Sequence, residues 1–182
     1  MQSNVSDRGH WHLDIEGGCR VRGAYQLFTS QVSPIVDVTE DHIWHKHVPL
    51  KVFILAWRLL QDRLLTKANL LNCGIISAEA RCVVGCGHAE SASHLFLQCD
   101  IFASLWQYVR YWIGVSEVEP HSLRAHFIQF THYLGGSKAR RSFLQLLWLL
   151  CIWLVWNERN NRFFNNIQTT IIDRMEKVKY YF

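Results

Sequence analysis

The fold of this chain is decided by the segment Cys82-Val83-Val84-Gly85-Cys86-Gly87-His88-Ala89-Glu90-Ser91-Ala92-Ser93-His94-Leu95-Phe96-Leu97-Gln98-Cys99. Its three cysteines and one of its histidines follow the spacing C-x3-C-x7-H-x4-C within 18 residues. Thiolate and imidazole are the ligands that zinc prefers, and four of them complete a tetrahedral structural site with no open position. We therefore predict one structural zinc ion, held by Cys82, Cys86, His94 and Cys99.

The residues between these ligands indicate how the backbone brings them together. Gly85 and Gly87 flank Cys86, so the chain can turn sharply there without a steric penalty from a Cβ atom. On a regular α-helix His94 and Cys99 would lie about 140° apart. We therefore expect a helix that begins near His94, with a loop closing over the ion. Ser91 and Ser93 are the candidate N-caps of this helix.

Other interpretations of the cysteines remain open. Free buried cysteines pack as small hydrophobic side chains, and the motif cysteines could belong to such a core. His88 is a candidate substitute ligand, with a solvent-exposed loop histidine as the alternative, and Cys73 is a candidate alternate ligand. Cys19 and Cys151 lie far from the motif in sequence and have no predicted role.

Further motifs surround this segment on both sides. They read Val48-Pro49-Leu50-Lys51-Val52, Trp57-Arg58-Leu59-Leu60, Thr66-Lys67-Ala68-Asn69-Leu70 and Glu90-Ser91-Ala92-Ser93-His94-Leu95. In this combination the chain resembles the zinc-binding domain found downstream of the polymerase in plant non-LTR (LINE-type) retrotransposon reverse transcriptases. The resemblance is close over residues 44–106 and looser around Trp11–Tyr25 and Trp153–Asn160. Leu65 stands where the family usually has proline, which makes the end of the preceding helix less sharply defined.

The resemblance implies a role next to a polymerase. In the family this domain is thought to help grip the RNA template or the target DNA during primed reverse transcription. The resemblance therefore predicts RNA or DNA as a partner and a reverse transcriptase domain as a second one. The family segment that joins the polymerase to the zinc domain begins here almost at residue 1, so we expect a truncated copy.

Composition limits the class of protein. With 182 residues, 49% hydrophobic residues and eight tryptophans, the chain can form one core rich in large aromatic side chains. The formal net charge of +4 permits nucleic-acid binding without requiring it. The polar N-terminus contains no apolar run of a secretory signal. We therefore expect an intracellular protein of the nucleus or cytoplasm, not a secreted one, with reduced thiols.

A basic stretch precedes the metal motif. Residues 42–67 contain five Lys and Arg residues and one acidic residue, Asp62. Cationic side chains contact phosphates, and an aromatic residue such as Trp44 can stack on unpaired bases. The alternative for each cation is a solvated helix face. The candidate nucleic-acid contacts are Lys46, Lys51, Arg58, Arg63 and Lys67.

Hydrophobic periodicity predicts a mainly α fold with one short N-terminal β-hairpin at residues 11–22. Helices are expected at 50–64, 67–72, 99–113, 123–134, 138–164 and 171–178. In the first of them Lys51, Arg58 and Asp62 form a narrow polar stripe, so we expect most of this helix to be buried. We divide the chain into an N-terminal tail, hairpin and linker at 1–41, a zinc-binding helical core at 42–114 and a C-terminal helical extension at 115–182.

Residues 143–156 form a run of 14 residues that is apolar on nearly every side. A membrane-spanning helix needs about 20 such residues. We interpret the run as a buried core helix and expect no membrane association. The alternatives are a helix that binds a protein partner and one that associates with a membrane.

Catalytic motifs are missing from the sequence. Polymerase chemistry needs clustered carboxylates that hold metal ions, and no Tyr-x-Asp-Asp motif is present. No glycine-rich phosphate loop is present either. We therefore predict a non-catalytic zinc-binding module that binds nucleic acid. The alternative is a structural, zinc-stapled module that docks on a polymerase or another protein.

Overall fold

The computed structural model describes residues 45, 48–77, 79–115, 122–133 and 136–180. The predicted hairpin, the predicted region 1–41 and the candidate contact Lys46 lie outside the described residues. The described elements are, in order, α3 (Leu50–Leu60), α4 (Lys67–Asn72), η1 (His94–Gln98), α5 (Asp100–Ile113), α6 (Leu123–Ile128), η2 (Gln129–Tyr133), α7 (Lys138–Asn165) and α8 (Ile171–Tyr180). The prediction of a mainly α chain with a long apolar C-terminal helix is confirmed.

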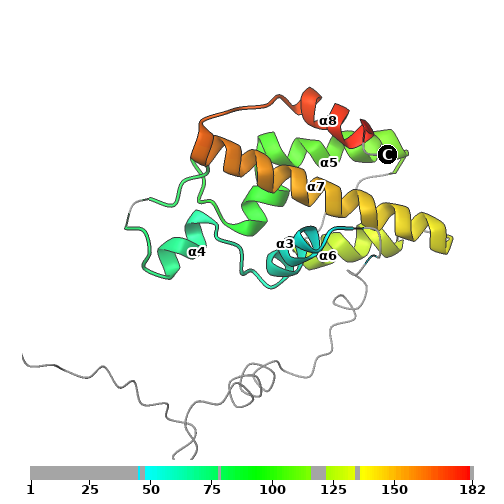
Figure 1. Ribbon diagram of the computed structural model, residues 1–182, viewed down its shortest axis with the longest axis horizontal. Helices are drawn as coiled ribbons and strands as arrows, with labels where there is room; N and C mark the ends of the chain where they lie inside the picture. Colours follow the sequence, from blue (N-terminus) through cyan, green and yellow to red (C-terminus); the bar gives the residue numbers. More distant parts are fainter. Residues whose placement is uncertain (1–44, 46–47, 78, 116–121, 134–135, 181–182) are drawn as a thin grey trace, which may run out of the picture. The chain divides into compact units, whose positions relative to one another are not determined.

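Helix α7 is the centre of the compact unit Val38–Phe182 (Figure 1). Helices α3 and α6 pack on one side of it, and α5 and α8 pack on the other. The core between them is built from large side chains, of which Trp148, Phe102, Phe127 and Phe130 are fully buried. Contacts of α3 with α7 and of α5 with α8 join residues on both sides of position 114 within this one unit.

The turn between α3 and α4 is held by side chains of the Thr66–Leu70 motif. Helix α3 ends at Leu60 rather than at residue 64, and Asp62, just after its end, takes a left-handed backbone conformation with φ of 51°. The Asn69 side-chain amide donates to the carbonyl oxygens of Asp62 and Leu64, each at 2.9 Å. Thr66 caps α4, as predicted, because its hydroxyl accepts the Asn69 N–H at 3.3 Å. These hydrogen bonds fix the turn between α3 and α4, so the motif has a structural role.

Helix α3 is less buried than its sequence predicts. Val52, Phe53, Leu55, Ala56 and Leu59 face the core. We expected most of this helix to be buried, but only five of its eleven residues are, and 42% of Ile54 and 37% of Trp57 are exposed. The helix packs on α7 and α6 with one face only, so apolar residues outside that face stay at the surface. The exposed face of α3 therefore carries both apolar and cationic side chains.

Helix α7 is a core helix with a charged C-terminal half. Among the described helices it is the one whose length and hydropathy would allow it to cross a membrane. Leu147, Trp148, Cys151, Ile152 and Val155 on this helix are fully buried against the other helices, and 44% of its apolar window is buried. Near its end Glu158 and Arg159 are also buried. Both side chains form ion pairs, and the partner of Arg159, which is Glu90, lies beside the predicted metal site.

Candidate metal centre

The structure brings the four predicted ligands together. The ligand atoms of Cys82, Cys86, His94 and Cys99 all lie within 4.8 Å of one another. Cys82, His94 and Cys99 are buried, and Cys86 is partly buried. The Cys86 Sγ and His94 Nε2 atoms are 3.2 Å apart. Two ligands come from a tight loop and two from either end of η1, so one ion at this point would tie the loop to the helix.

The first ligand pair lies on a loop closed by backbone hydrogen bonds. Gly85 N–H donates to the Cys82 carbonyl at 3.0 Å, and Cys82 N–H donates to the His88 carbonyl at 2.9 Å. Gly85 and Gly87 have φ values of 75° and 85°, which non-glycine residues rarely adopt. The two glycines therefore place Cys86 opposite Cys82, as their positions in the motif predict.

The second ligand pair is brought together by a π-turn. Residues His94–Gln98 form a π-helix, in which Cys99 N–H donates to the His94 carbonyl at 2.8 Å. An i→i+5 hydrogen bond widens the turn, so residues five positions apart lie closer to the same side of the helix. The separation of about 140° expected on an α-helix is thereby reduced. Ser91 caps this segment as predicted, accepting the His94 N–H at 3.1 Å, whereas the Ser93 side chain does not cap it.

The side chains of the two buried cysteines interact with each other. A hydrogen bond between the side chains raises the pKa of Cys82 far above its ordinary value and lowers the pKa of Cys99 to about 5. Two sulfur atoms this close cannot both be thiolates unless a cation lies with them. A divalent metal ion supplies that charge and deprotonates coordinating thiols outright.

The donor set fits zinc. Three sulfurs and one imidazole nitrogen are a typical structural zinc set, with Zn–S bonds of about 2.3 Å and Zn–N bonds of about 2.0 Å. Ligand atoms at the corners of such a tetrahedron are roughly 3.5–3.8 Å apart. The observed separations, all within 4.8 Å, are close to this arrangement. All four positions are taken by protein, which favours a structural role over a catalytic one.

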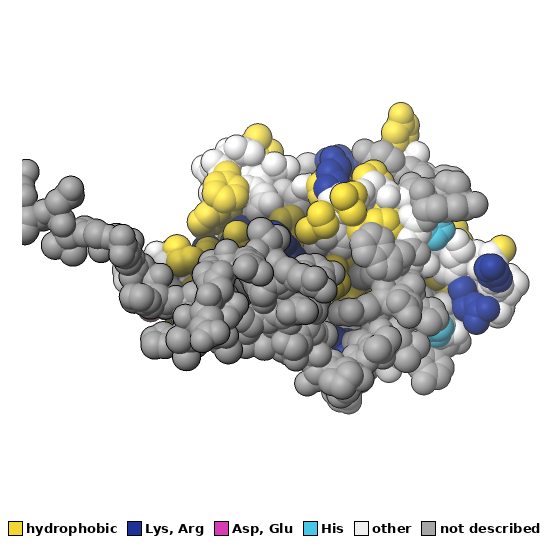
Figure 2. Space-filling model, turned by 60° about the horizontal axis from the view of Figure 1, so that its bottom comes forward, with side chains coloured by type: hydrophobic (Ala, Val, Ile, Leu, Met, Phe, Trp, Pro, Cys, Tyr) yellow, Lys and Arg dark blue, Asp and Glu magenta, His cyan; other side chains and the backbone are white. Residues whose placement is uncertain are grey.

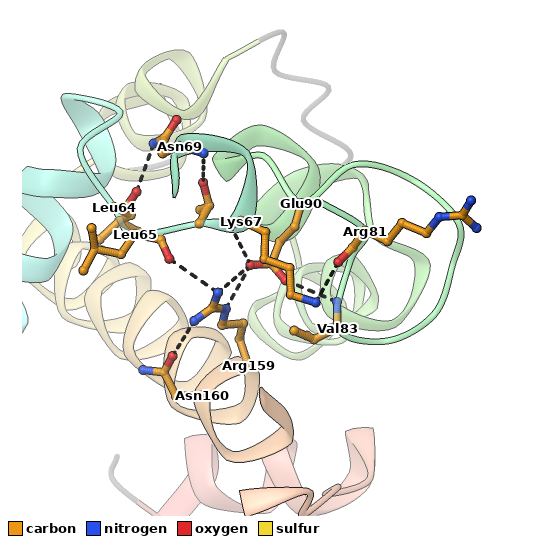
Figure 3. Close-up of polar contacts among 10 residues, drawn as sticks. Leu64, Leu65, Lys67, Asn69, Arg81, Val83, Glu90, Arg159 and Asn160 are labelled. Atoms are coloured by element: carbon orange, nitrogen blue, oxygen red, sulfur yellow. Dashed lines mark hydrogen bonds and ion pairs between the residues drawn. The ribbon is translucent and has the colours of Figure 1, made fainter. Parts of the chain in front are cut away.

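A buried carboxylate beside the loop connects the cluster to α7 (Figure 3). Glu90 is fully buried, and its Oε1 accepts from Arg159 Nη2 at 2.7 Å and Nε at 3.0 Å. The same oxygen accepts Lys67 N–H at the start of α4, at 3.1 Å, and Oε2 accepts Val83 N–H within the metal loop, at 3.2 Å. One carboxylate thus binds the metal loop, α4 and α7 together.

Sequence reasoning missed Glu90 and Arg159 as supporting residues. They are 69 positions apart, so no local pattern relates them. A signal was nevertheless present, because both belong to motifs quoted above: Glu90 opens the segment Glu90–Leu95, and Arg159 lies in Trp153–Asn160, after the apolar run of α7. A charged residue directly after a buried apolar run needs a buried partner.

The remaining cysteine and histidine candidates lie outside the cluster. The His88 ring stacks on His94, with the ring centroids 5.2 Å apart, and is exposed. Cys73 is also exposed. Cys151 is buried in the apolar core, where burial raises the pKa of its thiol.

The candidate nucleic-acid contacts are placed on α3 and at its C-terminal corner. Lys51, Arg58 and Arg63 are exposed, and Lys67 is partly exposed. Lys51 Nζ lies 4.9 Å from the ring centroid of Trp153, and Lys67 Nζ lies 5.1 Å from that of Phe163. Lys67 Nζ also donates to the Arg81 carbonyl at 3.0 Å. Lys51 and Arg58 line the same hollow of the surface, between α3 and α7.

Comparison with known families finds one match. Residues 20–106 match the family described as zinc-binding in reverse transcriptase. The matched range contains all four clustered ligands as well as Glu90. No curated protein and no solved structure matches the chain.

Proposed function

We propose that this chain is a non-catalytic, zinc-stapled module that binds nucleic acid, of the kind that follows the polymerase in plant LINE-type reverse transcriptases. The observation that carries the zinc part is the convergence of Cys82, Cys86, His94 and Cys99 within 4.8 Å, inside the range matched by the family. One ion held there would be structural, since protein supplies all four ligands. The module would work in an intracellular compartment, where its thiols stay reduced.

The nucleic-acid part is supported by charge. Lys51 and Arg58 are seven residues apart on α3, so they lie on the same face of the helix. Among the described residues neither has an acidic partner, and both are exposed. Arg63 and Lys67 extend the cationic side chains past the end of α3. Surface cations in a row that are not neutralised by acidic side chains are suited to a phosphate backbone.

A salt titration tests this function. Zinc-loaded protein of verified 1:1 metal content is titrated with single-stranded RNA and with duplex DNA at several salt concentrations. We expect affinity to fall steeply with salt, and the double variant Lys51→Gln/Arg58→Gln to reduce the slope by about one per lost phosphate contact. Lys177→Gln, an exposed cation on α8, is the charge-matched control.

The alternative, a module that docks on a polymerase, is the other outcome of the same experiment. If no binding is measured even at low salt, nucleic acid is not the partner. Trp148 and Leu147 in the tryptophan-rich run are fully buried by the chain's own helices. A protein partner would then have to contact the exposed side chains of the run's flanks.

A further inference from the structure

The surface between α3 and α7 is hollowed into a groove of about 410 Å³. Its walls come from α3, the Leu64–Leu70 corner and the C-terminal half of α7. Small-ligand sites are typically about 300–1,000 Å³ in volume, so the groove is large enough for a planar ring with its attached sugar. It does not overlap the metal cluster, and the function proposed above uses only its cations Lys51 and Arg58.

Aromatic side chains form the α7 wall of this groove. They are Trp153, Trp156, Phe163 and Phe164. Phe164 is 71% exposed and Phe163 is 45% exposed, and their rings meet edge to face at 4.8 Å. Exposed apolar side chains that gather in one hollow, rather than singly, are typical of an interaction site.

Cations surround this aromatic wall. Lys51 lies over the Trp153 ring, and Lys67 lies over the Phe163 ring. Arg58 lines the groove from α3. Arg159 also reaches the groove, but its charge is neutralised by Glu90. The three remaining cations have no acidic partner among the described residues. On the face shown in Figure 2, Lys and Arg side chains lie among hydrophobic ones.

We propose that the groove holds an unpaired base of a single-stranded nucleic acid, stacked on the aromatic side chains of α7. The flanking phosphates would contact Lys51 and Arg58. Aromatic faces inside a positively charged groove are the arrangement that single-strand binding requires, since stacking holds the bases and cations hold the backbone. A duplex offers no unpaired base, and an apolar peptide helix would leave the cations without counter-charges. This inference rests on the nucleic-acid binding proposed above and adds the strand type and the site.

The test separates bases from phosphates. Zinc-loaded protein is titrated with a 12-nucleotide oligothymidylate strand, with an abasic strand of the same length and charge, and with a 12-base-pair duplex. We expect the oligothymidylate to bind more tightly than the abasic strand and the duplex. Phe164→Ala should weaken oligothymidylate binding roughly fivefold, which is the low end of the affinity loss expected when one base loses its stacking partner. Binding of the abasic strand should be unchanged.

Matched controls keep the result interpretable. Tyr111→Ala removes a ring that is 88% exposed on α5, outside the groove, and should change nothing. Each variant must hold one zinc per chain and give the same circular dichroism spectrum as the parent. Because Phe164 is mostly exposed, its truncation leaves the core intact.

Each outcome decides a different question. If the parent binds all three probes equally, and Phe164→Ala does as well, nucleic-acid binding stands and the groove proposal is overturned. If the parent binds none of them at low salt, both proposals fail together. If an acidic amphipathic peptide binds and its affinity falls with Phe164→Ala while the oligothymidylate does not bind, the groove is a protein-docking site instead.

Discussion

Glu90 is the residue on which the metal loop, α4 and α7 depend together. It is fully buried, and its oxygens accept from two backbone N–H groups and from the Arg159 guanidinium. A buried ion pair contributes little relative to a well-packed apolar pair, but losing one partner leaves an uncompensated charge. Arg159 also lies over the rings of Trp156 and Phe163, at 5.0 and 4.8 Å from their centroids.

Glu90→Gln therefore should be strongly destabilising. The amide is nearly isosteric but leaves the Arg159 charge buried without a counter-charge, which costs about 3 kcal/mol or more in the free energy of unfolding. The control is Glu79→Gln, which removes the carboxylate of the exposed pair with Arg81. Exposed pairs contribute at most about 1 kcal/mol. Urea denaturation of both variants measures the difference in the free energy of unfolding. Equal midpoints would show that the buried pair is no more important for stability than the exposed pair.

Cys99 is a candidate metal ligand, and it is also the residue that closes the π-turn. Cys99→Ser removes the sulfur but keeps the backbone hydrogen bond, so the loss of tight zinc binding should be attributable to the ligand alone. Because structural zinc contributes about 10 kcal/mol or more to the folding of small zinc domains, the melting temperature should fall as well. Cys73→Ser, at an exposed cysteine outside the cluster, is the matched control. Full zinc content and an unchanged melting temperature in Cys99→Ser would overturn the ligand assignment.

The metal loop depends on two glycine conformations. Gly87 has φ of 85°, and a Cβ atom there would meet no neighbour within 4 Å, so any penalty for alanine comes from the backbone alone. A left-handed backbone costs a non-glycine residue about 1–2 kcal/mol. We expect Gly87→Ala to lower stability by about 1 kcal/mol and to weaken zinc binding, with Gly87→Asn less affected because asparagine tolerates this region.

Gly136→Ala is the control for this loop, because Gly136 has no positive φ and a Cβ atom there would also meet nothing within 4 Å. Its stability should be unchanged or slightly raised. Zinc competition with a chromogenic chelator measures the affinities. Equal affinities for Gly87→Ala and Gly136→Ala would mean that the loop can reach the ligand geometry by another path.

Helices α6 and α7 meet at a buried histidine. His126 Nδ1 accepts the indole N–H of Trp148 at 3.0 Å, and its ring lies 4.4 Å from that of Trp106. Burial, assisted by the charge of Arg110, lowers the pKa of His126 from 6.5 to about 3. In the unfolded chain His126 therefore becomes protonated below about pH 6.5, whereas in the folded chain it stays neutral down to about pH 3. The free energy of unfolding should fall as pH decreases through this window.

The slope expected from one proton is about 1.4 kcal/mol per pH unit. Protonation of the metal ligands also destabilises the fold at low pH, so the informative quantity is the difference between the parent and His126→Gln at each pH. The glutamine variant can still accept from Trp148 but does not titrate. The difference in the free energy of unfolding between the parent and His126→Gln should shrink steadily from pH 6.5 to pH 4.5. A difference that is constant with pH would mean that His126 takes up its proton at the same pH in the folded and the unfolded protein.

The sequence predicts those features that depend on short spacings. The ligand set, the two glycine turns, the Thr66 and Ser91 caps and the end of α5 at Gly114 all follow from neighbours a few residues apart. The π-turn does not, because it is a compromise between burying Leu95 and Phe96 and aligning His94 with Cys99.

Long-range packing accounts for what the sequence did not predict. The exposure of Ile54 and Trp57 depends on which face of α3 meets α7, and a helical wheel contains no such information. The pair Glu90–Arg159 joins residues 69 positions apart. Both features belong to the side of the molecule where the groove lies, which is why the groove itself could not be predicted.

Removal of zinc should affect more of the molecule than the metal loop. Glu90 is joined to Val83 in the loop, to Lys67 in α4 and to Arg159 in α7, so loss of order in the loop frees the carboxylate that holds these elements together. After chelation, we expect faster amide hydrogen exchange in residues 82–99, in 66–70 and around Arg159. Helix α6 and the first half of α7 share a core of their own, built on Phe127 and Trp148, and should stay protected.

Added zinc should restore the original exchange pattern in the parent but not in Cys99→Ser, which identifies the cluster as the cause. An increase confined to residues 82–99 would show that the Glu90 contacts survive without the metal and that loop and helix are independent. Faster exchange throughout α6 and α7 would show instead that the metal is needed for the whole fold, as in small zinc domains that unfold without it. The predicted result lies between these limits, because the helical core is large but one of its buried charges depends on the metal loop.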